Sequence, residues 1–112
     1  MINRAALILR YKQLAVDWIN EADPYDSAQV TLEEVNQDST VYLLDQYEQP
    51  ELLQWLKLNY DNLFQSILFE WYVDESLWPK KRSYDLFNRW FDIEYHSLVE
   101  DTLGTPIIEE EG

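Results

Sequence analysis

Residues 51–72 constrain the fold most strongly, because their apolar side chains recur every three or four positions. Polar residues fall between the apolar ones, which is the pattern of a helix with one buried side. The apolar stripe contains Leu52, Leu56, Leu63, Ile67 and Trp71, and it is widened by Leu53, Tyr60, Phe64 and Leu68. We predict one helix here, beginning near Pro50 with Gln49 as its cap, and about 33 Å long at the usual rise per residue. Such a helix can cover a three-stranded sheet.

The remaining composition favours a single domain built on this helix. Hydrophobic residues make up 46% of the 112 positions, and the chain has only two glycines and four prolines, which is unlike a disordered segment. A chain of this length is too short to divide into two parts that each bury an adequate core. We therefore predict one domain over residues 1–101 and a loosely ordered acidic C-terminal tail over residues 102–112.

Three segments have the apolar or alternating pattern of strands, and the first of them is apolar enough to lie in the middle of a sheet. These segments are residues 5–12, 40–44 and 92–100. Shorter helices are predicted at residues 13–22 and 84–91, the second capped by Ser83. Thr31 and Glu34 have the spacing of a capping box, which predicts a helical turn between the first two strands.

The predicted order is thus strand, helix, strand, long helix, short helix, strand. This order favours the α+β class, with a small three-stranded sheet (β-α-β-α-α-β order) and the helices packed on one face. Both connections between strands are long and contain helix, so parallel neighbours are permitted and an antiparallel final strand is equally open.

The charge of the chain argues against nucleic acid as a ligand. The formal net charge is -14, and ten Asp and Glu but no Lys or Arg lie between Gln13 and Leu56. Proteins bind the phosphate backbone mainly through Lys and Arg, so an acidic surface repels it. Solubility explains such a surface most simply, and an alternative is that it imitates DNA or docks a basic partner.

Cysteine is absent from the chain, which excludes disulfides and metal sites built on sulfur. The apolar run between Arg4 and Arg10 is too short for a signal peptide or a membrane span, so no membrane contact is predicted. We expect a soluble cytoplasmic protein. No cofactor is predicted, since the only glycines are Gly104 and Gly112 and the glycine-rich phosphate-binding motifs are impossible.

Asp92, Glu94 and His96 are the candidate metal or acid-base residues. Their spacing of two on a strand brings all three side chains to one face, with successive ones about 7 Å apart. Two carboxylates and an imidazole suit a divalent metal such as Mn, Fe or Zn. The simpler interpretation is a solvated strand face, because three ligands on one twisted strand diverge and the chain has no second histidine.

Lys80, Lys81 and Arg82 are the candidate anion-binding residues, and they follow Trp78, which the sequence suggests to be exposed. Basic side chains beside a tryptophan can bind a phosphate or stack on a base. In a chain of net charge -14, pairing with the protein's own acidic surface is the simpler explanation.

Aromatic residues are concentrated between positions 60 and 95, which contain eleven of the seventeen in the chain. Phe69 and Tyr72 stand off the main stripe of the long helix, which suggests that its C-terminal end needs a second cover. Aromatic residues are enriched at interface centres, so this region is the predicted interface. Its residues are Phe69, Trp71, Tyr72, Trp78 and Trp90.

These features favour a non-enzymatic protein-protein interaction module that forms a homodimer, or binds another protein, through its aromatic helical region. One alternative is a small metal-dependent or acid-base enzyme that uses Asp92, Glu94 and His96. A third possibility is a small molecule bound in an aromatic pocket between the sheet and the long helix.

Overall fold

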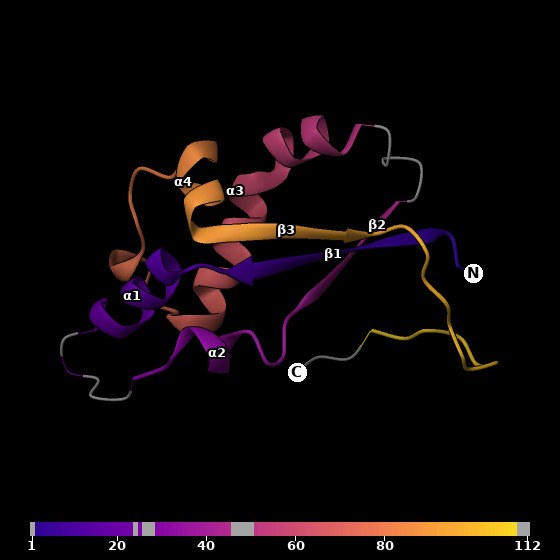
Figure 1. Ribbon diagram of the computed structural model, residues 1–112, viewed down its shortest axis with the longest axis horizontal. Coiled ribbons are helices and arrows are strands. Elements are labelled where there is room, and N and C mark those ends of the chain that lie inside the picture. The colour runs from indigo at the N-terminus through magenta and orange to yellow at the C-terminus, as the bar shows by residue number, and fades with distance from the viewer. Residues whose placement is uncertain (1, 24, 26–28, 46–50, 110–112) are drawn as a thin grey trace.

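Three strands and four α-helices make up the described structure (Figure 1). The computed structural model describes residues 2–23, 25, 29–45 and 51–109. In chain order the elements are β1 (Arg4–Tyr11), α1 (Gln13–Glu21), α2 (Leu32–Val35), β2 (Val41–Asp45), α3 (Leu52–Trp71), a 3-10 helix (Glu75–Leu77), α4 (Tyr84–Trp90) and β3 (Phe91–His96). The predicted α+β class and the predicted sequence of strands and helices are confirmed.

The sheet has the strand order β2-β1-β3, and both pairings are antiparallel. β1 is therefore the central strand, as predicted. Leu7, in the middle of β1, lies opposite Tyr42 of β2 and opposite Tyr95 of β3. The direction of the last strand, which the sequence left open, is thus antiparallel.

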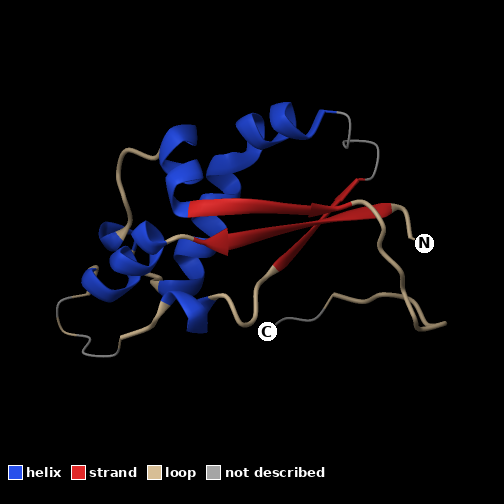
Figure 2. Cartoon of the chain, viewed as in Figure 1, coloured by secondary structure: helices blue, strands red, loops and turns tan. Residues whose placement is uncertain are grey.

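The two faces of this sheet have different surroundings. Ala5, Leu7 and Leu9 of β1 are buried in one core cluster with residues of α3, and we call this side of the sheet the covered face. Side chains alternate along a strand, so the even-numbered residues of β1 lie on the opposite side, which we call the open face. Figure 2 looks onto the open face, with α3 passing behind the strands. Among the described residues, no helix packs on the open face.

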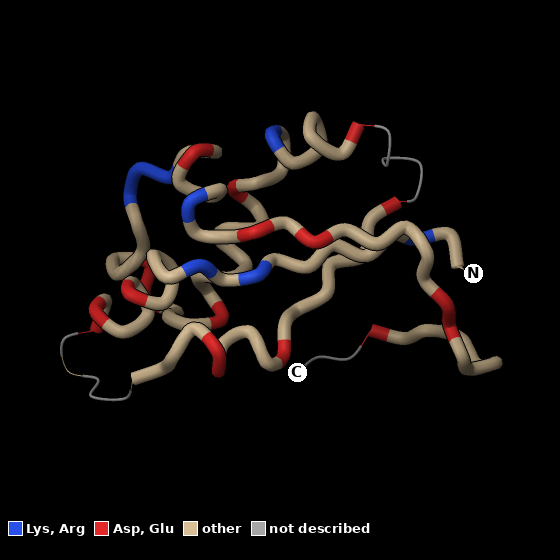
Figure 3. The backbone as a smooth tube through the Cα atoms, viewed as in Figure 1, with Lys and Arg blue, Asp and Glu red and all other residues tan. Residues whose placement is uncertain are grey.

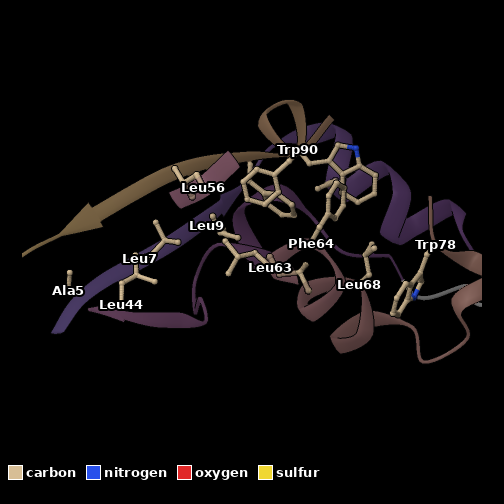
Figure 4. Packing of buried hydrophobic residues seen from close by; sticks show 14 residues of the cluster. Ala5, Leu7, Leu9, Leu44, Leu56, Leu63, Phe64, Leu68, Trp78 and Trp90 are labelled. Atoms are coloured by element: carbon tan, nitrogen blue, oxygen red, sulfur yellow. The ribbon is translucent and has the colours of Figure 1, made fainter. Parts of the chain in front are cut away.

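The long helix α3 provides most of the cover, and it spans Leu52–Trp71, close to the predicted range. Its buried residues are Leu56, Leu63, Phe64, Ile67 and Leu68, which follow the predicted stripe. Figure 4 shows Leu63 beside Leu9 of β1, with Leu7 and Leu44 farther towards one end of the same cluster. Leu68 lies towards its other end, between Phe64 and Trp78. Pro50 and Gln49, the predicted start of the helix, lie outside the described residues.

Aromatic rings fill the core where α3, α4 and β3 meet. The ring of Phe64 lies 5.0 Å from that of Trp90, 5.8 Å from that of Phe91 and 5.9 Å from that of Phe87. These contacts are edge to face, the geometry that aromatic pairs prefer. Trp90 also packs 5.4 Å from Trp18 of α1, which joins the first helix to the same core.

Side-chain caps set two of the shorter helices as predicted. The hydroxyl of Thr31 accepts the backbone N–H of Glu34 at 3.1 Å, and the hydroxyl of Ser83 accepts that of Leu86 at 3.1 Å. Each hydroxyl satisfies a donor that the first helical turn leaves without a partner. The chain can therefore begin α2 and α4 at defined positions despite their short lengths.

The predicted last strand ends four residues too late, at residue 100 instead of His96. Pairing between β1 and β3 ends at Ala6 and His96, whereas the alternating pattern continues to Glu100. Beyond His96 the backbone N–H of Ile2 is bonded to the carbonyl of Val99, at 2.9 Å, but no ladder continues. Alternation alone does not extend a strand, because each residue also needs a partner in the neighbouring strand.

Residues 102–109 have no helix or strand and are exposed. Within the described part of the chain, no helix combines the length and the apolar character that crossing a membrane requires.

Candidate functional site

The predicted carboxylate and histidine cluster lies on the open face, on β3. Glu94 accepts hydrogen bonds from Nε and Nη2 of Arg10, each at 3.3 Å, and its Oε2 lies 3.0 Å from Nε2 of His96. Asp92 pairs with Lys12 at 3.4 Å. The bond from Arg10, followed by that of His96, holds the pKa of Glu94 below its usual value. Glu94 is therefore a charged carboxylate already paired with a cation.

This arrangement does not bring three metal ligands together. In the described ranges, no group of three or more His, Asp or Glu side chains could hold a metal ion. Arg10 in addition donates to the backbone carbonyl of Asn36 and to the hydroxyl of Ser39, at 3.3 and 3.2 Å. The guanidinium of Arg10 thus links β3 to the connector before β2, and its role is structural.

One residue of the predicted anion-binding segment, Arg82, is already paired within the protein. Arg82 donates to Asp61 of α3 at 2.7 Å and to the carbonyl of Pro79 at 3.0 Å. Its hydrogen bond is the main cause that lowers the pKa of Asp61. Lys80 and Lys81 are exposed. The simpler expectation, pairing with the protein's own carboxylates, holds for Arg82.

Trp78 is not exposed, and the expectation that it stands free beside these basic residues is wrong. Only 8% of Trp78 is accessible, and its indole N–H donates to the carbonyl of Tyr72 at 2.7 Å. The indole lies in the main core cluster. It is therefore unable to stack on a base next to Lys80.

The predicted aromatic interface is mostly turned inward. Trp90 is buried in the core with Trp78, and Trp71 donates its indole N–H to the hydroxyl of Tyr11 at 2.8 Å. The hydroxyl of Tyr72 donates to the carbonyl of Ile19, and its ring lies 5.2 Å from that of Trp18. Of the five residues predicted, Phe69 alone is exposed, with 57% of its surface accessible. The second cover of the long helix is thus supplied by α1, α4 and the 3-10 segment of the same chain.

The open face is the larger feature that the sequence did not reveal. Its apolar centre includes Ile8 and Ala6 of β1 with Val41 and Leu43 of β2, and about half of each of these two β2 side chains is accessible, at 50% and 49%. Charged residues surround this centre on both sides. They are Arg4, Arg10 and Lys12, which are basic, Asp45, Asp92 and Glu94, which are acidic, and His96.

The formal charges on this face cancel, whereas the whole chain carries -14. Figure 3 shows basic positions at the end of β1 beside acidic positions of β3, and the register places their side chains on the same face. The signal was present in the sequence as the even-numbered residues of β1 and the odd-numbered residues of β2. The grouping of these residues on one face could not be predicted without the register, which places Ala6 opposite Leu43 and His96.

A smaller feature is a pocket of about 100 Å³ between the sheet and α3. It lies on the covered side, where the sequence predicted an aromatic pocket, and Tyr11, Tyr42 and Trp71 line it.

The chain matches no protein-family model, and no curated protein sequence or solved structure shows significant similarity to it.

Proposed function

We propose that this protein is a non-enzymatic interaction module that self-associates by packing the open face of one copy against the open face of another. The observation that carries this proposal is a partly apolar, charge-balanced sheet face in a chain of net charge -14. The predicted aromatic helical surface is a weaker candidate, because most of its residues already pack within the chain. The proposed setting is the cytoplasm, which suits a chain without cysteine.

Charge favours this face for contact between identical chains. Two copies that meet through a twofold axis use the same patch on both sides, so the patch must be complementary to itself. Arg10 and Lys12 of one copy can lie near Asp92 and Glu94 of the other, while the net charge of the patch adds no repulsion. A contact through the acidic remainder of the surface would place like charges together.

The apolar centre supplies the driving force. Val41 and Leu43 are half exposed in the single chain, and covering them removes apolar surface from water. Two antiparallel sheets pack face to face at about 10 Å, with the side chains of the inner faces interdigitating. The proposed contact would give this sheet the second layer that its open face lacks.

An enzyme that uses Asp92, Glu94 and His96 is not favoured by the geometry. Glu94 is held by Arg10, and Asp92 by Lys12, so neither carboxylate is arranged around a common substrate or metal position. A metal would first have to displace these cations.

Sedimentation equilibrium of the wild type and of two matched variants tests the proposal. Leu43→Asp places a charge in the centre of the open face, whereas Leu58→Asp makes the same change on α3, where 76% of the leucine is accessible. We expect the wild type and Leu58→Asp to dimerise at concentrations of about 10–100 μM, and Leu43→Asp to stay monomeric over that range. Far-UV circular dichroism verifies that both variants are folded.

A wild type that is monomeric throughout this range would contradict self-association. If Leu58→Asp dissociated the dimer and Leu43→Asp did not, the open face would be the wrong surface.

A further inference from the structure

The pocket between the sheet and α3 is lined by aromatic and acidic side chains. Three aromatic side chains line it, Tyr11 from β1, Tyr42 from β2 and Trp71 from α3. Its volume of about 100 Å³ is the space of roughly three water molecules. A compact head group of a few heavy atoms can therefore enter it, whereas a nucleotide cannot.

Among the described lining residues of the pocket, carboxylates supply the only formal charges. Asp38, from the connector before β2, and Glu70, from α3, both line the pocket, and none of its described lining residues is Lys, Arg or His. The hydroxyl of Thr40 donates to Oε1 of Glu70 at 3.2 Å, which positions that carboxylate beside the pocket. An anion would thus be repelled, and a cation attracted.

The phenols remain neutral at physiological pH. Burial raises the pKa of Tyr11 to about 12, and burial likewise raises the pKa of Tyr42, with the Glu70 carboxylate adding to both shifts. The Tyr11 hydroxyl accepts the indole N–H of Trp71 at 2.8 Å, so the Tyr11 and Trp71 side chains are held in place. Neutral aromatic rings attract cations through their faces, and this attraction grows where water is excluded.

We propose that this pocket binds an alkylammonium group, with Glu70 and Asp38 balancing its charge and Tyr11, Tyr42 and Trp71 surrounding it. An ammonium group has N–H donors on one compact centre, and the carboxylates and hydroxyls of the pocket are acceptors. The site lies on the covered side of the sheet, so it is separate from the self-association surface on the open face. Binding at the pocket can therefore occur in the monomer and in the dimer.

Methylammonium chloride is the simplest probe, and the indole N–H resonance of Trp71 in a proton-nitrogen correlation spectrum is the reporter. We expect a saturable shift of this resonance with a Kd of about 10 mM, near the limit for a ligand with two heavy atoms. Sodium chloride at the same ionic strength should leave the resonance in place. A parallel titration with Nα-acetyl-lysine methylamide distinguishes a free amine from a lysine side chain, which should bind more tightly if a protein supplies the group.

Glu70→Gln is the decisive variant, because the amide keeps an acceptor for Thr40 and removes the charge. Glu75→Gln is its matched control, since it removes the same charge from an exposed residue that does not line the pocket. Affinity for methylammonium should fall about fivefold in Glu70→Gln, the upper range for one partly exposed ion pair, and should not change in Glu75→Gln.

A wild-type resonance that does not saturate, or that moves equally with sodium chloride, would overturn the proposal. So would equal weakening by Glu70→Gln and Glu75→Gln, because that result would mean attraction by net charge alone. Neither result bears on dimerisation through Leu43, so the two proposals fail separately.

Discussion

The two faces of one three-stranded sheet differ in what covers them. The covered face is closed by α3 and by aromatic residues of the same chain, so its side chains are buried and its rings contact one another. The open face has an apolar centre surrounded by paired charges, and no helix in the described structure packs on it. The covered face therefore accounts for the stability of the single chain, and the open face is where a second chain can add to it.

Leu44 and Leu43, neighbours in β2, provide the sharpest comparison. Leu44 is 6% accessible on the covered face, and Leu43 is 49% accessible on the open face. Leu44→Ala should lower the free energy of unfolding by about 2–4 kcal/mol, because it leaves a cavity in the core. Leu43→Ala should lower it by less than about 1 kcal/mol in the monomer, and urea denaturation at low protein concentration measures both. Equal losses would mean that the two faces are covered alike.

Alkaline pH tests the covered face through Tyr11. Its folded pKa is raised to about 12 by burial, whereas an unfolded tyrosine ionises near 10, so the folded state holds its proton over this interval. Stability should therefore be fully present below pH 10 and should fall as pH rises towards 12, by up to about 2–3 kcal/mol from this group.

Tyr11→Phe should remove this part of the alkaline decline while costing about 1 kcal/mol at neutral pH, because Trp71 loses its hydrogen-bond acceptor. Urea denaturation at several alkaline pH values measures both effects. If the stability of Tyr11→Phe declined at alkaline pH as steeply as that of the wild type, the decline would come from other tyrosines.

Substitution of Tyr95, unlike the substitutions above, should stabilise the protein. Its hydroxyl is buried and has no hydrogen-bond partner among the described residues. A buried hydroxyl without a partner destabilises the fold, so Tyr95→Phe should raise the free energy of unfolding by about 1 kcal/mol. Thermal unfolding followed by circular dichroism measures this effect. A loss of stability would show that the hydroxyl is satisfied by water.

The smallest expected effect belongs to the open face. The pKa of Glu94 is lowered by Arg10 and then by His96, so the pairing contributes above the usual carboxylate pKa and is lost as pH falls through the folded value. Glu94→Gln should change stability little at neutral pH, because exposed ion pairs are weak, and should make the acid side of the stability profile flatter than in the wild type. A steeper acid loss in Glu94→Gln would contradict this assignment.

Periodicity predicted the elements that a single chain segment determines. The stripe from Leu56 to Leu68 is visible in the sequence, and so is the apolar run that makes β1 central. Thr31 and Ser83 also signal their caps locally. These features depend on residues close in sequence, which is why they could be recognised.

Contacts between distant segments could not be predicted in the same way. Trp78 and Trp90 are large aromatic residues, and the sequence alone does not show that other parts of the same chain cover them, so it predicts them at an interface although both are buried in the core. The pairing of Arg10 with Glu94 depends on the register of β1 and β3. The open face likewise exists only once three separate strands are aligned, and its residues are not conspicuous one by one.

Contact between open faces is tested most directly by isotope-filtered nuclear Overhauser spectra of a mixture of labelled and unlabelled protein. This experiment detects only protons of one copy that lie close to protons of another. We predict intermolecular signals to the methyl groups of Val41 and Leu43. Signals to Phe69 and Val73 at the end of α3, with none to Val41 and Leu43, would contradict the open face as the surface of self-association.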